Sequence, residues 1–256
     1  MIRSVKTLLG PLAAKTTILL SVVFFFMATA PDGAAQKRFS RTYPAGQNVR
    51  IQLMNRTGTV TVEGWNRSEV AIAASLESPA ANIVPQNLSG TIVINVVRDN
   101  QGRGEVGAVN FIIRVPLTTM VDIETRIGNL NVSNISGGQV RAHISTDGDI
   151  TLLNIGAVNV SAESGMGDIL FDGEIQGNGN YRFTSISGNI TVRIPFNSSY
   201  KLVATAPSTR NISLGQCAGG SFSPFGNGRR VVGKCGDGSA SMTVVNQRGP
   251  ISFLRR

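Results

Sequence analysis

Apolar and polar residues alternate along most of the chain, and the alternation restarts after a glycine about every twenty residues. At each restart the glycine is followed by Asn or Asp and then by apolar residues at every second position. Glycine beside Asn or Asp favours a tight turn, and alternation is typical of a strand with one buried face. A fixed period of this length indicates stacked units, none of which can bury its apolar face alone. The clearest copies are Gly128–Val132, Gly148–Leu152, Gly167–Phe171 and Gly188–Val192.

A second short strand precedes each of these turns, so each unit offers two strands. The pattern favours an all-β fold, a single-stranded parallel β-helix-like solenoid with rungs of about 20 residues. A β-sandwich, whose strands also recur at short intervals, is the alternative. The apolar positions of the preceding strands are Val121 and Ile123, Val140 and Ala142, Val158 and Val160, and Tyr181 and Phe183. The glycines to which we assign structural turns are Gly58, Gly128, Gly148, Gly167, Gly188 and Gly249.

The pattern is less regular towards both ends of the chain. Regular rungs begin at about residue 121, and two weaker copies, Asn211–Leu214 and Gly249–Phe253, are expected to continue the stack. Between them, residues 215–238 are rich in Gly, Ser and Asn and are interpreted as an insertion. At the other end, Phe39–Leu53 is expected to cover the exposed rung, because an open strand edge invites pairing with other chains. The sequence thus predicts a single domain over residues 36–256.

The first 35 residues are interpreted as a signal peptide. Arg3, Lys6 and Lys15 precede an apolar run, Thr16–Ala28, and small residues lead to a cleavage point after Ala35. The run is short for a membrane span, which needs about 20 residues. We therefore expect a chain exported to the periplasm, the cell surface or the medium, with no transmembrane segment after cleavage. An uncleaved N-terminal signal anchor is the alternative.

Export affects how the charges and cysteines are interpreted. Removing residues 1–35 changes the formal net charge from +9 to +7, which favours anionic partners, although outside the cell we expect no nucleic acid. The basic residues are spread along the sequence, so we interpret them as solvated side chains. The two cysteines, Cys217 and Cys235, are expected to form a structural disulfide, because disulfides persist in exported proteins. A bridge across a loop of this length is worth about 3 kcal/mol.

Few residues offer chemistry, and each also has a structural interpretation. Asp149 and Asp168 follow equivalent turn glycines and should stack on adjacent rungs, where they either bind calcium or serve as turn residues. Trp65 is the only tryptophan, and it either stacks on a sugar or covers the end of the core. His143 is the only histidine, its orientation is open, and no nucleophile motif accompanies it. We therefore assign no catalytic, cofactor or metal residues.

One phrase supports a family resemblance. Asn55–Val70, NRTGTVTVEGWNRSEV, resembles the opening signature of a bacterial putative-adhesin family of exported β-strand-repeat proteins, related to the head domains of putative autotransporter adhesins. The family pattern continues to a strand ending in Val-Pro, here Val115–Pro116, and then to the serial glycine units. The resemblance covers Phe39–Phe253 and implies a solenoid-like fold at the cell envelope, with no catalytic residues. The insertion that contains both cysteines departs from the plain repeat.

These observations favour a non-enzymatic protein of the cell envelope or surface, an adhesin-like module that binds a glycan or a protein partner. Its binding element would be the solvent-facing surface of the strands, where Thr, Ser, Asn and Arg side chains suit polar, extended partners. The alternative is a carbohydrate-active enzyme on a β-helix scaffold that uses Asp149 and Asp168 as an acid and base pair. The sequence does not specify the ligand, the partner protein or the oligomeric state.

Overall fold

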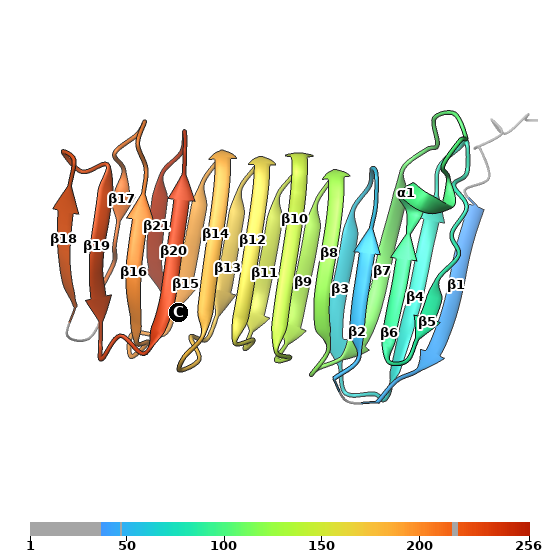
Figure 1. The fold of residues 1–256 in the computed structure, drawn as a ribbon, viewed down its shortest axis with the longest axis horizontal. Helices are drawn as coiled ribbons and strands as arrows, with labels where there is room; N and C mark the ends of the chain where they lie inside the picture. Colours follow the sequence, from blue (N-terminus) through green and yellow to red (C-terminus); the bar gives the residue numbers. More distant parts are fainter. Residues whose placement is uncertain (1–36, 47, 217–219) are drawn as a thin grey trace, which may run out of the picture. The chain divides into compact units, whose positions relative to one another are not determined.

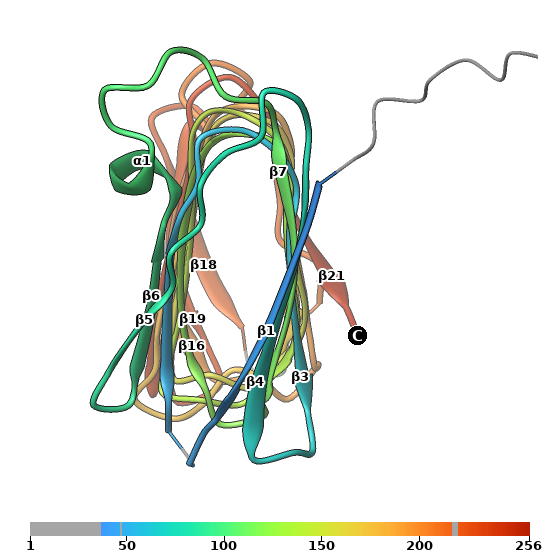
Figure 2. The same ribbon diagram turned by 90° about the vertical axis from the view of Figure 1, so that its right-hand side faces the viewer.

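The computed structural model describes residues 37–46, 48–216 and 220–256 of the chain. These residues form two long sheets that face each other (Figures 1 and 2). The expected signal peptide, residues 1–35, lies outside the described residues. The helix α1 (Val96–Asp99) has four residues, and no helix in the described ranges is long and apolar enough to cross a membrane.

Sheet A has ten strands and sheet B has eleven. The order along sheet A is β1 (Lys37–Pro44), β4 (Glu69–Leu76), β7 (Val109–Pro116), β3 (Val60–Trp65), β9 (Leu130–Ile135), β11 (Ile150–Ile155), β13 (Ile169–Gly173), β15 (Ile190–Ile194), β21 (Ile251–Arg255) and β17 (Ile212–Ser213). The order along sheet B is β5 (Gln86–Leu88), β6 (Thr91–Asn95), β2 (Arg50–Met54), β8 (Met120–Ile127), β10 (Gln139–Asp147), β12 (Asn159–Met166), β14 (Asn180–Ser187), β20 (Ala240–Asn246), β16 (Tyr200–Thr205), β19 (Arg230–Cys235) and β18 (Ser221–Phe225).

The middle of the chain forms regular rungs, each with one strand in sheet B and one in sheet A. Neighbouring rungs pair in parallel, and equivalent residues lie side by side: Ile150 pairs with Ile169, which pairs with Ile190. All three are buried. Strand spacing of about 4.8 Å therefore repeats one apolar ladder through the core. The predicted all-β solenoid is confirmed, and the β-sandwich is not what the chain forms.

The core between the sheets contains the aromatic residues of two successive rungs. Phe171 packs against Phe183, with ring centroids 5.0 Å apart, and against Tyr181 at 5.9 Å. One expected core position is wrong: Val158 precedes β12 and is 39% exposed, whereas the inward pair of that strand is Val160 and Ala162. Apolar residues at every second position can continue into the loop before a strand, so the pattern does not show where the strand starts. Val158 fits the alternation but lies in the loop before β12.

The turn glycines stack on one another along one edge of the rungs. Gly167 has a φ of +135°, which residues other than glycine rarely adopt. A Cβ at this position would also collide with the carbonyl oxygen of Gly148. The same collision relates Gly188 to Gly167 and Gly148 to Gly128. Gly249 continues this ladder against Gly188 but has no positive φ, and Pro250 follows it instead of Asn or Asp. Close backbone approach, more than turn conformation, makes glycine necessary at this last position.

The order of rungs in space differs from their order in the sequence at both ends. The rung β2–β3 lies between β6–β7 and β8–β9, and the rung β20–β21 lies between β14–β15 and β16–β17 (Figure 1). Both weaker copies, Asn211–Leu214 and Gly249–Phe253, therefore continue the stack, but β21 lies inside β17 although it comes later in the sequence. The β20–β21 rung buries a full set of apolar residues that needs neighbours on both sides, whereas β17 has only two residues.

Antiparallel strands end both sheets at the N-terminal side of the stack and end sheet B at the other side, where sheet A ends in the short parallel strand β17. The strand β1 pairs with β4, and β4 pairs with β7, so only the first part of the expected covering segment, Phe39–Leu53, lies at an edge. Its second part, β2, lies inside sheet B. At the opposite end, residues 221–235 of the expected insertion form the hairpin β18–β19, which pairs with β16.

Candidate functional site

The stacked turns carry a ladder of Asn and Asp side chains. Asn129 Oδ1 accepts a hydrogen bond from the backbone N–H of Asp149 at 3.0 Å, and Asp149 Oδ1 accepts one from Asp168 at 2.7 Å. Asp168 Oδ1 in turn accepts the backbone N–H of Asn189 at 2.7 Å, and the Asn189 amide also donates to both Asp168 oxygens at 3.1 Å. Each side chain therefore binds the backbone of the next rung.

This ladder brings together Asp149 and Asp168, the two carboxylates singled out by the sequence. Both are exposed, and both already accept backbone hydrogen bonds, which is the role that Asn and Asp commonly take in turns. Within the described ranges no group of three or more His, Cys, Asp or Glu side chains is arranged to hold a metal ion. The arrangement can order the turns, since each charge-assisted bond fixes the next rung.

A second set of turn residues was missed by the sequence analysis. Ser164 Oγ donates to the Gly148 carbonyl at 2.9 Å, and Ser185 Oγ is 3.3 Å from the Gly167 carbonyl. Asn246 Nδ2 donates to the Gly188 carbonyl at 2.8 Å. These buried side chains satisfy turn carbonyls that face the core. The signal in the sequence is a polar residue three positions before a turn glycine, and the buried examples are Asn55, Thr125, Ser164, Ser185 and Asn246. Ser145 has the same spacing from Gly148 but is exposed, because a bulge shifts the register after Ile144.

Trp65 lies at the end of β3, in the turn that leads to β4. Its indole Nε1 donates to the backbone carbonyl of Glu69 at 2.9 Å. The guanidinium of Arg67 lies 4.8 Å from the ring centroid, and that of Arg114 lies 5.9 Å from it. The ring is thus half-buried, bonded to its own turn and covered by cations, so it is not presented as an open platform for a sugar.

A charged cluster on the outer face of sheet B was also missed. Asp122 accepts hydrogen bonds from Arg50 at 2.8 Å and Arg141 at 3.0 Å. Burial raises the pKa of Asp122, but the hydrogen bonds and charges of these two arginines outweigh it and hold that pKa below its usual value. His143 lies on the same outer face, with Nδ1 3.2 Å from Arg141. His143 therefore points outward, away from the core. The carboxylate of Asp122 is satisfied by its ion pairs with Arg50 and Arg141.

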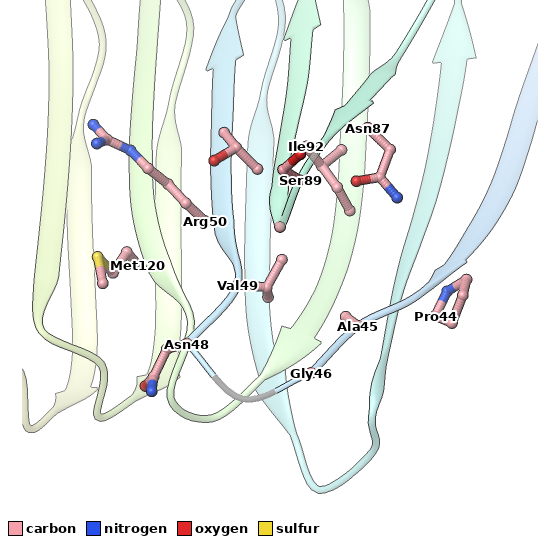
Figure 3. A pocket seen from close by; sticks show the side chains of 12 residues that line it. Pro44, Ala45, Gly46, Asn48, Val49, Arg50, Asn87, Ser89, Ile92 and Met120 are labelled. Atoms are coloured by element: carbon pink, nitrogen blue, oxygen red, sulfur yellow. The ribbon is translucent and has the colours of Figure 1, made fainter.

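A cleft of about 700 Å³ lies at the N-terminal end of the stack. It is bounded by the segment that leads into β2 and by the β5–β6 hairpin (Figure 3). Among the residues that the structure describes, its lining contains Arg50, Asn48 and Asn87 but neither a carboxylate nor a histidine. The guanidinium of Arg50 is already bound to Asp122. The cleft therefore supplies no acid and base pair for hydrolysis.

The cysteine pair is described only in part. Cys235 ends β19 and is buried, whereas Cys217 lies outside the described residues. The disulfide between them stays a prediction.

The outer face of sheet A carries a row of hydroxyl and amide side chains at one register position. Thr61 pairs with Asn131, Asn131 pairs with Thr151, and the row continues to Thr191 and Ser252. Leu170 is the single apolar residue between them. Among the described hydrogen bonds, none is made by the side chains of Thr61, Asn131, Thr151, Thr191 or Ser252. We call these five residues the hydroxyl row.

Comparisons with known proteins add the following findings. Residues 37–210 match the profile of a family described as Toastrack DUF4097. A solved structure of a "putative cell adhesion protein" from Clostridium sporogenes is 13% identical, with 86% of this chain and 100% of that chain covered at a TM-score of 0.48. One of a "putative adhesin" from Bacteroides fragilis is 10% identical, with 86% and 97% covered at a TM-score of 0.37. No curated protein matches the chain.

Proposed function

The chain belongs to the Toastrack DUF4097 family, and on that premise we propose that it is a non-enzymatic exported protein of the cell envelope or surface that binds a glycan or a protein partner through the outer face of sheet A. The observation that carries this proposal is the hydroxyl row. Its side chains repeat at the strand spacing of about 4.8 Å and make no described hydrogen bond of their own. A regular line of free donors and acceptors suits an extended polar polymer.

The carboxylates support binding over catalysis. In a glycosidase, two carboxylates flank the scissile bond from both sides. Asp149 and Asp168 instead lie side by side in one ladder, and each one accepts the backbone N–H of the following rung. No described residue that lines the cleft at the N-terminal end carries a carboxylate. A carbohydrate-active enzyme therefore stays the weaker alternative.

Export is part of the proposal and rests on residues 1–35, whose basic start, apolar run and small residues fit a signal peptide. A protein released across the membrane meets envelope glycans and surface proteins before it meets other partners. In this setting, a long sheet with a row of polar side chains that make no described hydrogen bond suits adhesion.

The test is a binding screen of residues 36–256 on arrays of envelope glycans and on isolated cell walls. The variant Thr151→Leu/Thr191→Leu removes two hydroxyl groups from the hydroxyl row and adds apolar bulk without changing the net charge. The matched control, Ser161→Leu/Thr184→Leu, makes similar changes on the outer face of sheet B. Affinity should fall by about tenfold or more in the first variant and stay nearly unchanged in the second.

Two outcomes would overturn the proposal. The absence of any ligand across arrays and cell walls would leave a scaffolding role. Turnover of a polysaccharide that disappears in Asp149→Asn would identify an enzyme, because the isosteric amide keeps the ladder acceptor and removes only the acid.

A further inference from the structure

The positive charge of the exported chain is concentrated at one end of the stack. Residues 196–256 contain eight Lys and Arg residues and one acidic residue, Asp237, a net charge of +7. Residues 36–195 contain thirteen basic and thirteen acidic residues and are neutral. The basic residues are spread along the sequence, but the acidic residues are almost absent from its last part, so the excess positive charge lies entirely on residues 196–256.

Four of these cations lie at the edge where the stacked turns lie, three in the loops after β16, β18 and β20 and one at the start of β19 (upper edge in Figure 1). We call them the arginine cluster: Arg210, Arg229, Arg230 and Arg248. All four are exposed.

Backbone and side-chain bonds hold the three loops of the arginine cluster together. Thr209 Oγ1 donates to the Gly249 carbonyl at 2.9 Å, which joins the loop of Arg210 to the turn of Arg248. The backbone N–H of Ala206 donates to the Arg229 carbonyl at 2.8 Å, which ties the hairpin to the same loop. Arg210 itself has a φ of +55°, a conformation that costs an arginine free energy and that Gly or Asn would adopt more readily. The sequence therefore keeps a cation where another residue would fold better.

The arginine cluster lacks counter-charges. Some arginines elsewhere bind carboxylates: Arg50 and Arg141 bind Asp122, and Arg193 and Arg256 bind Asp172. Other exposed arginines, such as Arg56, Arg126 and Arg182, form no ion pair among the described residues either, so what sets the arginine cluster apart is the excess of basic over acidic residues around it. In the described part of the chain, no member of the arginine cluster forms an ion pair. Edge protection does not require these charges either, since the edge strand β18 is short and contains Pro224, which already discourages strand pairing.

The hydroxyl row leads towards the arginine cluster. Ser252 follows Arg248 by four residues on β21 and pairs with Ser213, which follows Arg210 by three. A linear polymer lying along the hydroxyl row would therefore reach the arginine cluster at the Ser252 end of the row. From this continuity and from the unpaired charges, we infer that the arginine cluster binds an acidic polysaccharide, one whose repeating unit carries carboxylate or phosphate groups. The inference rests on the proposed function and names the class of its ligand.

The distribution of the remaining cations favours a flexible polymer over a flat membrane. Lys201 and Lys234 face each other across β16 and β19 on the outer face of sheet B, and Arg255 ends β21 in sheet A. A bilayer would meet only one side of this end, whereas a polysaccharide can follow both. The hairpin presents one exposed aromatic residue, Phe225, which is little apolar area for insertion into lipid. Guanidinium groups also match carboxylate and phosphate in a bidentate geometry.

The experiment measures binding of residues 36–256 to immobilised alginate, which carries carboxylates, and to wall teichoic acid, which carries phosphates, with dextran as the neutral reference. The variant removes four positive charges and gives residue 210 a side chain suited to its backbone: Arg210→Asn, Arg229→Gln, Arg230→Gln and Arg248→Gln. The control removes four exposed charges elsewhere: Arg38, Arg56, Arg126 and Arg182, each to Gln. Circular dichroism and thermal melting check that both variants fold.

We expect the wild-type protein to bind at least one of the two acidic polymers and not to bind dextran through the arginine cluster. Its affinity for the acidic polymer should fall as the salt concentration is raised. The arginine-cluster variant should bind about tenfold more weakly or worse, and the control should change little. Equal losses in both variants would mean that net charge alone is measured and would overturn the inference. So would binding to anionic phospholipid vesicles or duplex DNA that is as tight and equally sensitive to the variant.

The same data separate the two proposals. If neither acidic polymer binds but a neutral glycan or cell-wall ligand does, and Thr151→Leu/Thr191→Leu abolishes that binding, the proposed function stands and the acidic ligand is wrong. If an acidic polymer binds through the arginine cluster while changes in the hydroxyl row have no effect, the binding face proposed above is wrong and the arginine cluster acts alone.

Discussion

The glycine ladder offers the sharpest test of the architecture, through the substitution Gly167→Ala. The new methyl group would collide with the carbonyl oxygen of Gly148, which belongs to the backbone of the neighbouring rung and cannot rotate away. Alanine would also have to adopt the φ of +135° that Gly167 has. Forcing a side chain into a conformation nearly exclusive to glycine costs about 1–3 kcal/mol. Overpacking against a fixed backbone costs about 1–3 kcal/mol more.

The expected loss is therefore about 2–6 kcal/mol, a large part of a typical stability of about 5–15 kcal/mol. For a chain of this length it corresponds to a fall in melting temperature of roughly 5–20 °C. Circular dichroism with urea and with heat measures the change. Because stacked rungs interact mainly with their neighbours, partial unfolding is expected, and proteolysis should then reveal cleavage near the substituted turn.

The matched control is Gly156→Ala, in the loop between β11 and β12. Its nearest neighbour to a new Cβ would be the Ser136 Cβ at 3.7 Å, an ordinary contact, and its φ is not positive. Its N–H keeps the bond to the Ile135 carbonyl at 2.8 Å. This variant should be neutral or more stable by up to about 1 kcal/mol, because alanine restricts the unfolded chain. A Gly167→Ala variant as stable as the control would refute the stacking of the turns.

Three further predictions test other parts of the stack. Ile169→Ala should cost about 2–5 kcal/mol in urea unfolding because it opens a cavity in a closed ladder, whereas Leu170→Ala, on the outer face, should cost under about 1 kcal/mol; equal losses would mean that the register is wrong. Asp168→Asn should be near neutral with or without calcium, since the amide oxygen still accepts the Asn189 N–H, and a loss seen only with calcium would reveal a metal site. The pKa of Asp122 is lower in the folded state than the unfolded value of about 3.9, so the ionised carboxylate stabilises the fold above that pH. This contribution is lost as the pH falls through the lowered pKa. In the Asp122→Asn variant, the free energy of unfolding should therefore fall less steeply with decreasing pH in the acid range.

The repeat itself could be predicted from the sequence because its signal is local. Glycine, Asn or Asp and alternating apolar residues occur within five positions, and each reports a turn or a strand by its own chemistry. The resemblance to a family of exported strand-repeat proteins is confirmed by the match over residues 37–210. The stacking of equivalent isoleucines follows directly from the period.

Buried polar residues could not be read as easily. Ser164 occupies an inward strand position, where alternation predicts an apolar side chain, so it resembles a flaw in the pattern. Its role becomes visible only when the Gly148 carbonyl of the adjacent rung is seen to need a donor. The carbonyl and the serine are sixteen residues apart, and nothing local relates them. The Arg50–Asp122–Arg141 cluster was missed for the same reason, because its members belong to three different rungs.

The order of the rungs in space could not be predicted from the sequence, because parallel rungs are nearly interchangeable. Each presents the same inward apolar faces, so the pattern shows that β20–β21 is a rung without showing which neighbours it has. The order is decided by what can end a stack. A short rung such as β17 and an antiparallel hairpin such as β18–β19 leave little edge for another chain to pair with, whereas a complete apolar rung left outermost would expose its ladder. Placing β20–β21 inside and the hairpin outside satisfies this requirement, and it also sets the turn of Arg248 beside the loop of Arg210. The arrangement that closes the stack, with β20–β21 inside and the hairpin β18–β19 outside, thereby also brings the loops of the arginine cluster together. The C-terminal end, where the repeat is irregular in sequence, is thus the end that carries the excess positive charge.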